Sequence, residues 1–112
     1  MSRSDQQRAQ DVLDAAAELA DIVSAGHDRF LAETLRQRAA ERLLEIIGEA
    51  ANALTDEFRS SVAGIPWSEL TRLRIRLAHH YHRVDPEQVW TIAERDVPDL
   101  ARRLEDALGA AP

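Results

Sequence analysis

Apolar residues recur at steps of three and four along nearly the whole chain, which is the spacing of one face of an α-helix. This periodicity predicts helices over about residues 5–24, 28–54, 66–81 and 86–108. No segment alternates with the period of two that a half-buried strand requires. Only four glycines and four prolines interrupt a composition rich in Ala, Leu, Glu and Arg, which favour helices. The sequence therefore predicts an all-α fold.

Start and stop signals divide the first half of the chain. Gly26 is predicted to end the first helix, and Asp28 is predicted to cap the second. Thr55 is typical of the cap of an extra short helix. Gly48 interrupts the second helix, where it either allows another helix to approach closely or is a tolerated defect.

Prolines mark the second half of the chain. Pro66 suits the first turn of the third main helix, and Asp85 followed by Pro86 is a typical opening for the fourth. Pro98 is expected to break or kink that last helix. Because the loops are short and no linker is present, we expect one domain over residues 1–112, with a core of about 5–108. The expected architecture is an antiparallel four-helix bundle with an extra short helix.

Composition excludes several classes of protein. The chain carries twenty acidic and fourteen basic residues, a net charge of −6. It has no cysteine, so disulfides and a thiolate nucleophile are excluded. No apolar run approaches the ~20 residues of a membrane-spanning helix, and acidic residues stand where a signal peptide would carry its apolar segment. We therefore expect a cytoplasmic protein that does not enter the membrane.

One segment breaks this acidic character. Residues 72–83 contain no acid and hold a cluster of arginines and histidines: Arg72, Arg74, Arg76, His79, His80, His82 and Arg83. Three of the four histidines in the chain therefore lie in its one strongly basic patch. A solvated helix face would explain clustered arginines, but it explains the histidines less well.

Helix geometry divides this segment into two edges. At about 100° per residue, Arg72, Arg76 and His79 form one basic stripe. Arg74 lies on the flank of the core face and in line with Tyr81. Because Arg74 and His79 are about 140° apart on an ideal helix, they cooperate only if the helix unwinds or a second chain supplies one of them.

Arg74, His79 and Tyr81 together make an Arg-x4-His-x-Tyr motif, and here the chain resembles the HepT-like toxins of the HEPN superfamily. The resemblance covers about residues 8–108 and includes further segments: Leu44–Ala50, Ile65–Trp67, Val84-Asp85, Val89-Trp90 and Asp96–Leu100. One position departs from the family. The residue after the motif arginine is usually polar, and Ile75 stands there, which removes a hydrogen-bonding group beside the site.

The resemblance implies a toxin ribonuclease that works as a homodimer and is paired with a minimal nucleotidyltransferase antitoxin. It implies that Arg74 and His79 of the two copies meet to form the RNA-cleaving site. It also implies that the antitoxin transfers AMP from ATP onto Tyr81 and so silences the toxin. RNA is the expected substrate, and neither a metal nor a cofactor is expected.

These residue types suit RNA cleavage without a metal. His79, with an unperturbed pKa near ~6.5, can take the proton of a 2′-hydroxyl or protonate the leaving oxygen. Arg74 can hold the phosphate and stabilise its developing charge. The other basic side chains would bind the RNA backbone: Arg72, Arg76, His80 and Arg83. A metal site at His80 and His82 is a weaker hypothesis, because residues two apart do not share a helix face.

Two other functions remain open. In the first, the basic patch binds a nucleotide or RNA without cleaving it, because Ile75 has cost the protein its activity, and the chain serves its nucleotidyltransferase partner. In the second, the chain is a structural helical adaptor, and neutralising Arg72 and Arg74 would leave all binding unchanged. His27 is expected to take no part in catalysis, and Trp67 and Trp90 are expected to be core or interface aromatics.

Overall fold

The computed structural model describes residues 3–79 and 84–110, and every regular element within them is helical. In chain order the elements are α1 (Arg3–Ser24), α2 (His27–Ala32), α3 (Thr34–Ala53), α4 (Asp56–Ser61), α5 (Trp67–His79), α6 (Pro86–Thr91), the π-helical segment η1 (Ile92–Asp96) and α7 (Val97–Ala110). The predicted all-α fold is confirmed. None of the helices in this described part has both the length and the hydropathy of a bilayer-spanning segment.

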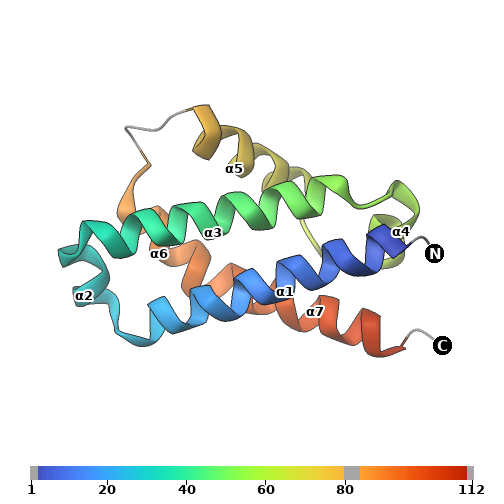
Figure 1. Ribbon diagram of the computed structural model, residues 1–112, viewed down its shortest axis with the longest axis horizontal. Coiled ribbons are helices and arrows are strands. Elements are labelled where there is room, and N and C mark those ends of the chain that lie inside the picture. The colour runs from blue at the N-terminus through green and yellow to red at the C-terminus, as the bar shows by residue number, and fades with distance from the viewer. Residues whose placement is uncertain (1–2, 80–83, 111–112) are drawn as a thin grey trace.

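The main helices, with α6, η1 and α7 taken as one, form four rods. The rods alternate in direction (Figure 1). α1 and α3 lie side by side, α5 packs on α3, and α6, η1 and α7 make one interrupted rod that packs on α1. This is the predicted antiparallel four-helix bundle. α4 is the predicted extra short helix, and α2 is a second short helix that the periodicity did not indicate. α5 lies at the edge of the bundle, since its extensive contacts within the described residues are with α3.

The continuous helix predicted over residues 28–54 is wrong in one respect, because the chain breaks at Glu33 between α2 and α3. Glu33 has an extended backbone, with φ −119° and ψ 105°. Its carboxylate accepts hydrogen bonds from Arg29 Nε at 2.6 Å and from Arg36 Nε at 2.9 Å. The break allows Phe30 to turn fully into the core, where its ring lies 5.5 Å from that of Trp90.

The predicted helix caps are confirmed at two positions and wrong at one. The Thr55 hydroxyl accepts a hydrogen bond from the Phe58 N–H, and the Asp85 carboxylate accepts one from the Glu87 N–H. The N-cap of α2 is Gly26, with φ 99°, and no side chain caps it. Asp28 lies instead in the first turn of α2, where its negative charge interacts favourably with the positive end of the helix dipole.

The last rod changes its helix type just before Pro98, which confirms the expected interruption. In an α-helix the Pro98 ring would clash with the carbonyl of Glu94, four residues earlier. The chain widens into η1 over this turn, and the Val97 N–H donates to the Ile92 carbonyl, five residues back. α6 and α7 therefore remain one rod with a π turn between them.

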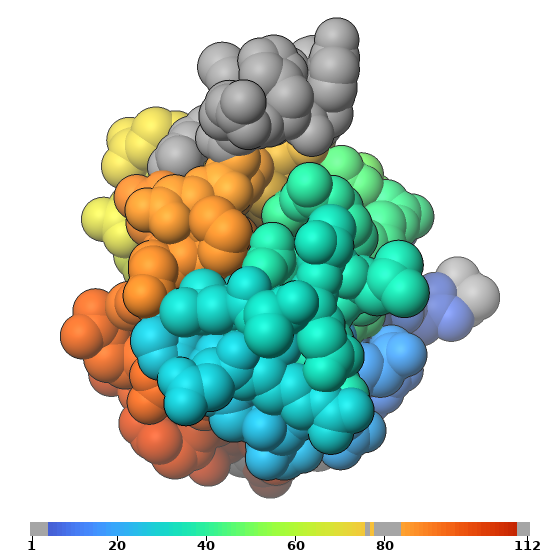
Figure 2. Space-filling model, turned by 90° about the vertical axis from the view of Figure 1, so that its left-hand side faces the viewer, coloured from blue at the N-terminus to red at the C-terminus, as the bar shows by residue number. Residues whose placement is uncertain are grey.

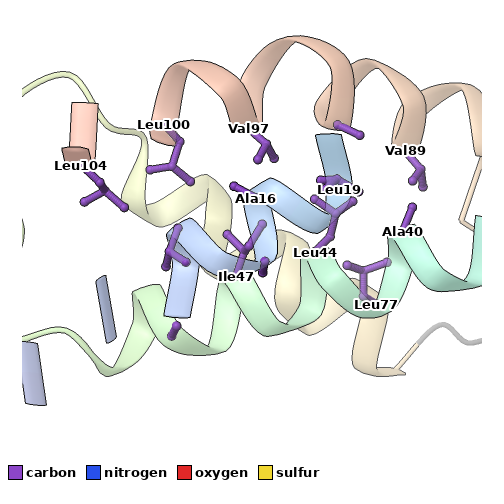
Figure 3. Packing of buried hydrophobic residues seen from close by; sticks show 14 of the residues in the cluster. Ala16, Leu19, Ala40, Leu44, Ile47, Leu77, Val89, Val97, Leu100 and Leu104 are labelled. Carbon is purple, nitrogen blue, oxygen red and sulfur yellow. The ribbon is translucent and has the colours of Figure 1, made fainter. Parts of the chain in front are cut away.

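The core lies where α1, α3 and the α6–α7 rod meet (Figure 3). Its largest fully buried side chains are all apolar: Phe30, Leu19, Leu44, Ile47, Leu104, Val12 and Val89. Small residues such as Ala16 and Ala40 allow the rods to approach closely. α5 adds Leu77 from the edge.

One buried carboxylate connects distant parts of the chain. Asp5, at the start of α1, accepts hydrogen bonds from the Thr55 N–H at 2.9 Å and from the Thr55 hydroxyl at 2.7 Å. These bonds, the one from the backbone N–H first, hold the pKa of Asp5 below its ordinary value. Because Thr55 also caps α4, this carboxylate fixes the corner between α3 and α4.

Candidate functional site

The motif helix α5 is fixed at its N-terminal end. It begins at Trp67, one residue after Pro66, so the proline lies just before the first turn. The Trp67 Nε1 donates to the Arg59 carbonyl at 3.0 Å and ties α5 to α4. Leu73 is half-buried and Leu77 is buried, so the core side of α5 is the one that the helix geometry predicted.

Gly48 brings α5 against α3. A Cβ atom on Gly48 would lie 2.6 Å from the Arg74 Cβ and 3.3 Å from the Leu70 carbonyl oxygen. Real Cβ contacts are essentially never as short as the first of these distances. Of the two roles that the sequence left open for Gly48, close helix approach is therefore the correct one, and the residue it admits is the motif arginine.

The Arg74 guanidinium contains a donor without an acceptor. Its Nε is buried and has no hydrogen-bond partner within the part of the chain that the structure describes. An arginine keeps its charge and its donors at any physiological pH. A buried donor left unpaired costs about 1–3 kcal/mol, so an oxygen acceptor that reached this atom would recover that free energy. Phosphate oxygens are suitable acceptors for a guanidinium.

Of the other α5 residues that the sequence singled out, the structure describes the side chains of Arg72 and Ile75. Arg72 is exposed, and its side chain has no ion-pair partner among the described residues. Ile75 is 44% exposed, a large apolar side chain open to solvent next to the motif arginine. Arg76 lies one turn after Arg72, and His79 is the last residue of α5. The side chains of Arg76 and His79 are outside the description.

Four predicted positions fall in residues 80–83, which the structure does not describe: His80, Tyr81, His82 and Arg83. The predicted meeting of Arg74, His79 and Tyr81 therefore stays a prediction. The structure describes the helices on either side of this segment, α5 before it and α6 after it (Figure 1).

His27, the first residue of α2, contacts the N-terminal half of α6. His27 Nε2 lies 2.6 Å from Glu87 Oε1, and the His27 ring lies 5.1 Å from that of Trp90. Figure 2 shows the same end of the molecule, with α6 beside the α2–α3 corner. His27 thus has a structural role that the sequence did not indicate. No local signal could have shown it, because its partner is 60 residues away.

Comparison with known proteins points to one family. The family model described as "Ribonuclease HepT-like" matches residues 12–107. Two proteins of Methanocaldococcus jannaschii that carry RNase in their names are 32% and 31% identical to this chain. Their matches cover 88% and 85% of this chain and 82% and 88% of the relatives.

A third relative, from Thermococcus cleftensis, is named "Probable ribonuclease HepT" and is 38% identical over 76 residues. That match covers 68% of this chain and 69% of the relative. No solved structure matches the chain significantly. The family match spans most of the chain and includes Gly48, Arg74 and the segment around them. The chain therefore belongs to the HepT-like ribonuclease family of the HEPN superfamily.

Proposed function

We propose that this protein is the toxin of a toxin–antitoxin pair and cleaves RNA without a metal, at a site that Arg74 and His79 form in a homodimer. One observation carries the proposal. Among the described residues the buried Arg74 Nε has no acceptor, and the close approach of α5 at Gly48 holds the Arg74 side chain against α3. An RNA phosphate would supply the missing oxygen.

The reaction is an internal displacement at phosphorus. The ribose 2′-hydroxyl loses its proton to a base and attacks the adjacent phosphorus, and the bond to the 5′-oxygen breaks. The products are a 2′,3′-cyclic phosphate and a 5′-hydroxyl. His79 serves as the base or as the acid that protonates the leaving oxygen, and its counterpart in the dimer takes the other role. Arg74 stabilises the charge that develops on the phosphate oxygens.

The shape of the bundle supports the dimer. α5 is covered by α3 on one side, while the exposed Ile75 lies on α5 beside the motif arginine. A two-fold axis near Ile75 would bury this apolar side chain against its own copy. The same axis would place the Arg74 of one copy close to the His79 of the other, which overcomes their separation of about 140° on a single helix.

Tyr81 is the proposed point of control. A nucleotidyltransferase antitoxin would add AMP to the Tyr81 hydroxyl. The added phosphate would then be carried by a residue only two positions after His79. A bulky anion at that point would compete with RNA for the arginines of α5 and would also block the groove. Arg76, His80 and Arg83, with Arg72, complete the basic surface that holds RNA.

A second candidate function rests on Ile75. This position is usually polar in the family, and here an apolar side chain is 44% exposed. In this alternative the protein binds a nucleotide or RNA and partners the nucleotidyltransferase without turnover. Binding that weakens at high salt, in a protein free of AMP that cleaves no RNA, would favour it.

The test compares RNA cleavage by the purified protein, free of AMP, with cleavage by His79→Ala. We expect the variant to lose at least about a hundredfold in rate, the usual contribution of a general acid or base. Equal residual cleavage by both proteins would refute the catalytic role. His27→Ala is the matched control, because this histidine contacts Glu87 and Trp90 and is expected to lie outside the chemistry. Treatment with the nucleotidyltransferase and ATP should silence the parent and leave Tyr81→Phe active.

A further inference from the structure

A cavity of about 380 Å³ lies between the first half of α5, the loop before it, η1 and α7. Its inner wall is apolar and includes Leu70, Leu73, Val97 and Leu100. Its rim carries charged side chains of both signs. This volume is at the lower end of the range for small-molecule sites, so the cavity suits a ligand of about the size of one nucleoside.

Two opposite charges on the rim have no partner among the described residues. Glu69 and Arg72 lie three residues apart on α5 and both line the cavity, yet their side chains have no ion pair or hydrogen bond with any described residue. The same spacing, acid first, gives an ion pair elsewhere in this chain: Glu33–Arg36, Asp56–Arg59 and Asp99–Arg102. A carboxylate and a guanidinium are therefore both available to a ligand at one edge of the cavity.

A second arginine contributes to the wall and is held there by two hydrogen bonds. Arg103 Nε donates to Asp99 Oδ2 at 3.0 Å, and Arg103 Nη1 donates to the Ala63 carbonyl at 3.5 Å. Its guanidinium lies over Gly64, which has φ +84°, and a Cβ there would lie 2.5 Å from Nη1. Any other residue at Gly64 would be strained and would displace Arg103. A guanidinium held in place offers a flat surface on which a base can stack.

We propose that this cavity is a guanine subsite for the RNA, an inference that rests on RNA being the substrate of the proposed function. Guanine carries two neighbouring acceptors, O6 and N7, to which an arginine donates two hydrogen bonds. It also carries two neighbouring donors, N1–H and the N2 amine, which suit a carboxylate. Arg72 and Glu69 supply these two groups, and the exposed Asp96 adds a second carboxylate from η1. No other RNA base presents both pairs.

The subsite lies beside the proposed cleavage site. Arg72 precedes His79 by seven residues on α5, which is about 10 Å along the helix axis, and the two share one stripe. A guanine held at Arg72 would therefore place a neighbouring phosphate toward the C-terminal end of α5. In this arrangement Arg72 binds a base edge, whereas binding to the phosphate backbone would be independent of sequence.

The experiment measures binding of two 2′-O-methyl RNA hexamers, which cannot be cleaved, by fluorescence anisotropy at fixed salt. One hexamer is all uridine, and the other has one guanosine. We expect the parent to bind the guanosine hexamer at least about tenfold more tightly. Glu69→Gln should lose most of this preference while binding the uridine hexamer within about twofold of the parent. Arg72→Lys keeps the charge and should also lose most of the preference, because a lysine lacks the fork of donors that binds O6 and N7 together. Arg8→Lys and Glu18→Gln, exposed residues of α1, are the matched controls and should keep the preference.

Equal affinity of the parent for both hexamers would overturn the subsite, as would a preference that both variants retain. If Arg72→Lys weakened both hexamers by the same factor, Arg72 would be a phosphate contact and the assignment would be wrong. The result is independent of turnover. A guanine preference in a protein that cleaves no RNA would refute the proposed catalysis and leave the subsite in place. Cleavage of RNA without a guanine preference would refute the subsite and leave the proposed catalysis in place.

Discussion

The two long helices that pack on α3, α1 and α5, differ in what they bury. α1 contributes a continuous apolar face: Ala9, Val12, Ala15, Ala16 and Leu19. Among the described side chains of α5, Leu77 alone is buried, and the other notable buried atom is the unpaired Nε of Arg74. Burial of apolar area is the main source of folding free energy. The comparison indicates that α1 buries more apolar surface than α5, and that α5 holds a buried polar atom with no partner among the described residues.

The comparison is tested most strongly by truncating one leucine on each helix. Leu19→Ala on α1 removes a side chain with no exposed surface and should lower the free energy of unfolding by about 2–5 kcal/mol. Leu73→Ala on α5 removes a half-buried side chain and should cost less than about 2 kcal/mol. Urea unfolding followed by circular dichroism measures both. A larger loss for Leu73→Ala would show that α5 is the more important helix for stability.

A smaller effect is expected where α5 meets α3. Gly48→Ala adds a methyl group at 2.6 Å from the Arg74 Cβ and should destabilise the fold by about 1–3 kcal/mol, against a gain in helix propensity of ~1 kcal/mol. RNA cleavage should fall as well, because Arg74 must move. Gly109→Ala on α7 is the matched control, since nothing lies within 4 Å of its added Cβ. Cleavage at the parental rate by Gly48→Ala would contradict the close approach at this point.

The smallest effect concerns Asp5, at the start of α1, and depends on pH. The pKa of Asp5 is lowered in the folded state by the hydrogen bonds from Thr55. A lowered pKa stabilises the fold above the unfolded pKa of about 3.9, and this contribution is lost as the pH falls through the folded value. Asp5→Asn should therefore melt below the parent at pH 7, and the difference should shrink below about pH 4. Thr55→Ala should show a weaker pH dependence of the same kind. A difference in melting temperature that is constant with pH would contradict this account.

Most of the fold could be predicted from local patterns. The helix periodicity, the Thr55 and Asp85 caps and the interruption at Pro98 all depend on residues within one or two turns of each other. The break at Glu33 could not be predicted, because the apolar stripe continues through it. The break accompanies the packing of Phe30 against Trp90, which lies 60 residues further along the chain.

The site could be predicted in part. The motif spacing identified Arg74, and helix geometry placed it on the flank of the core face, where the structure has it. The contact with Gly48 was one of two open possibilities, since Gly48 and Arg74 come from different helices. No pattern in the sequence indicated the cavity. Its wall combines α5 with η1 and α7, so the cavity depends on how the rods pack.

The most direct test of the central claim measures cleavage and stability together in Arg74→Met. Methionine keeps an unbranched apolar stem against Gly48 but removes the guanidinium. If Arg74 is kept for phosphate binding, RNA cleavage should fall by about 10²–10³. The melting temperature should stay the same or rise, because a buried donor without an acceptor is lost. A variant that cleaves RNA at the parental rate, or that loses stability and activity together, would contradict the claim.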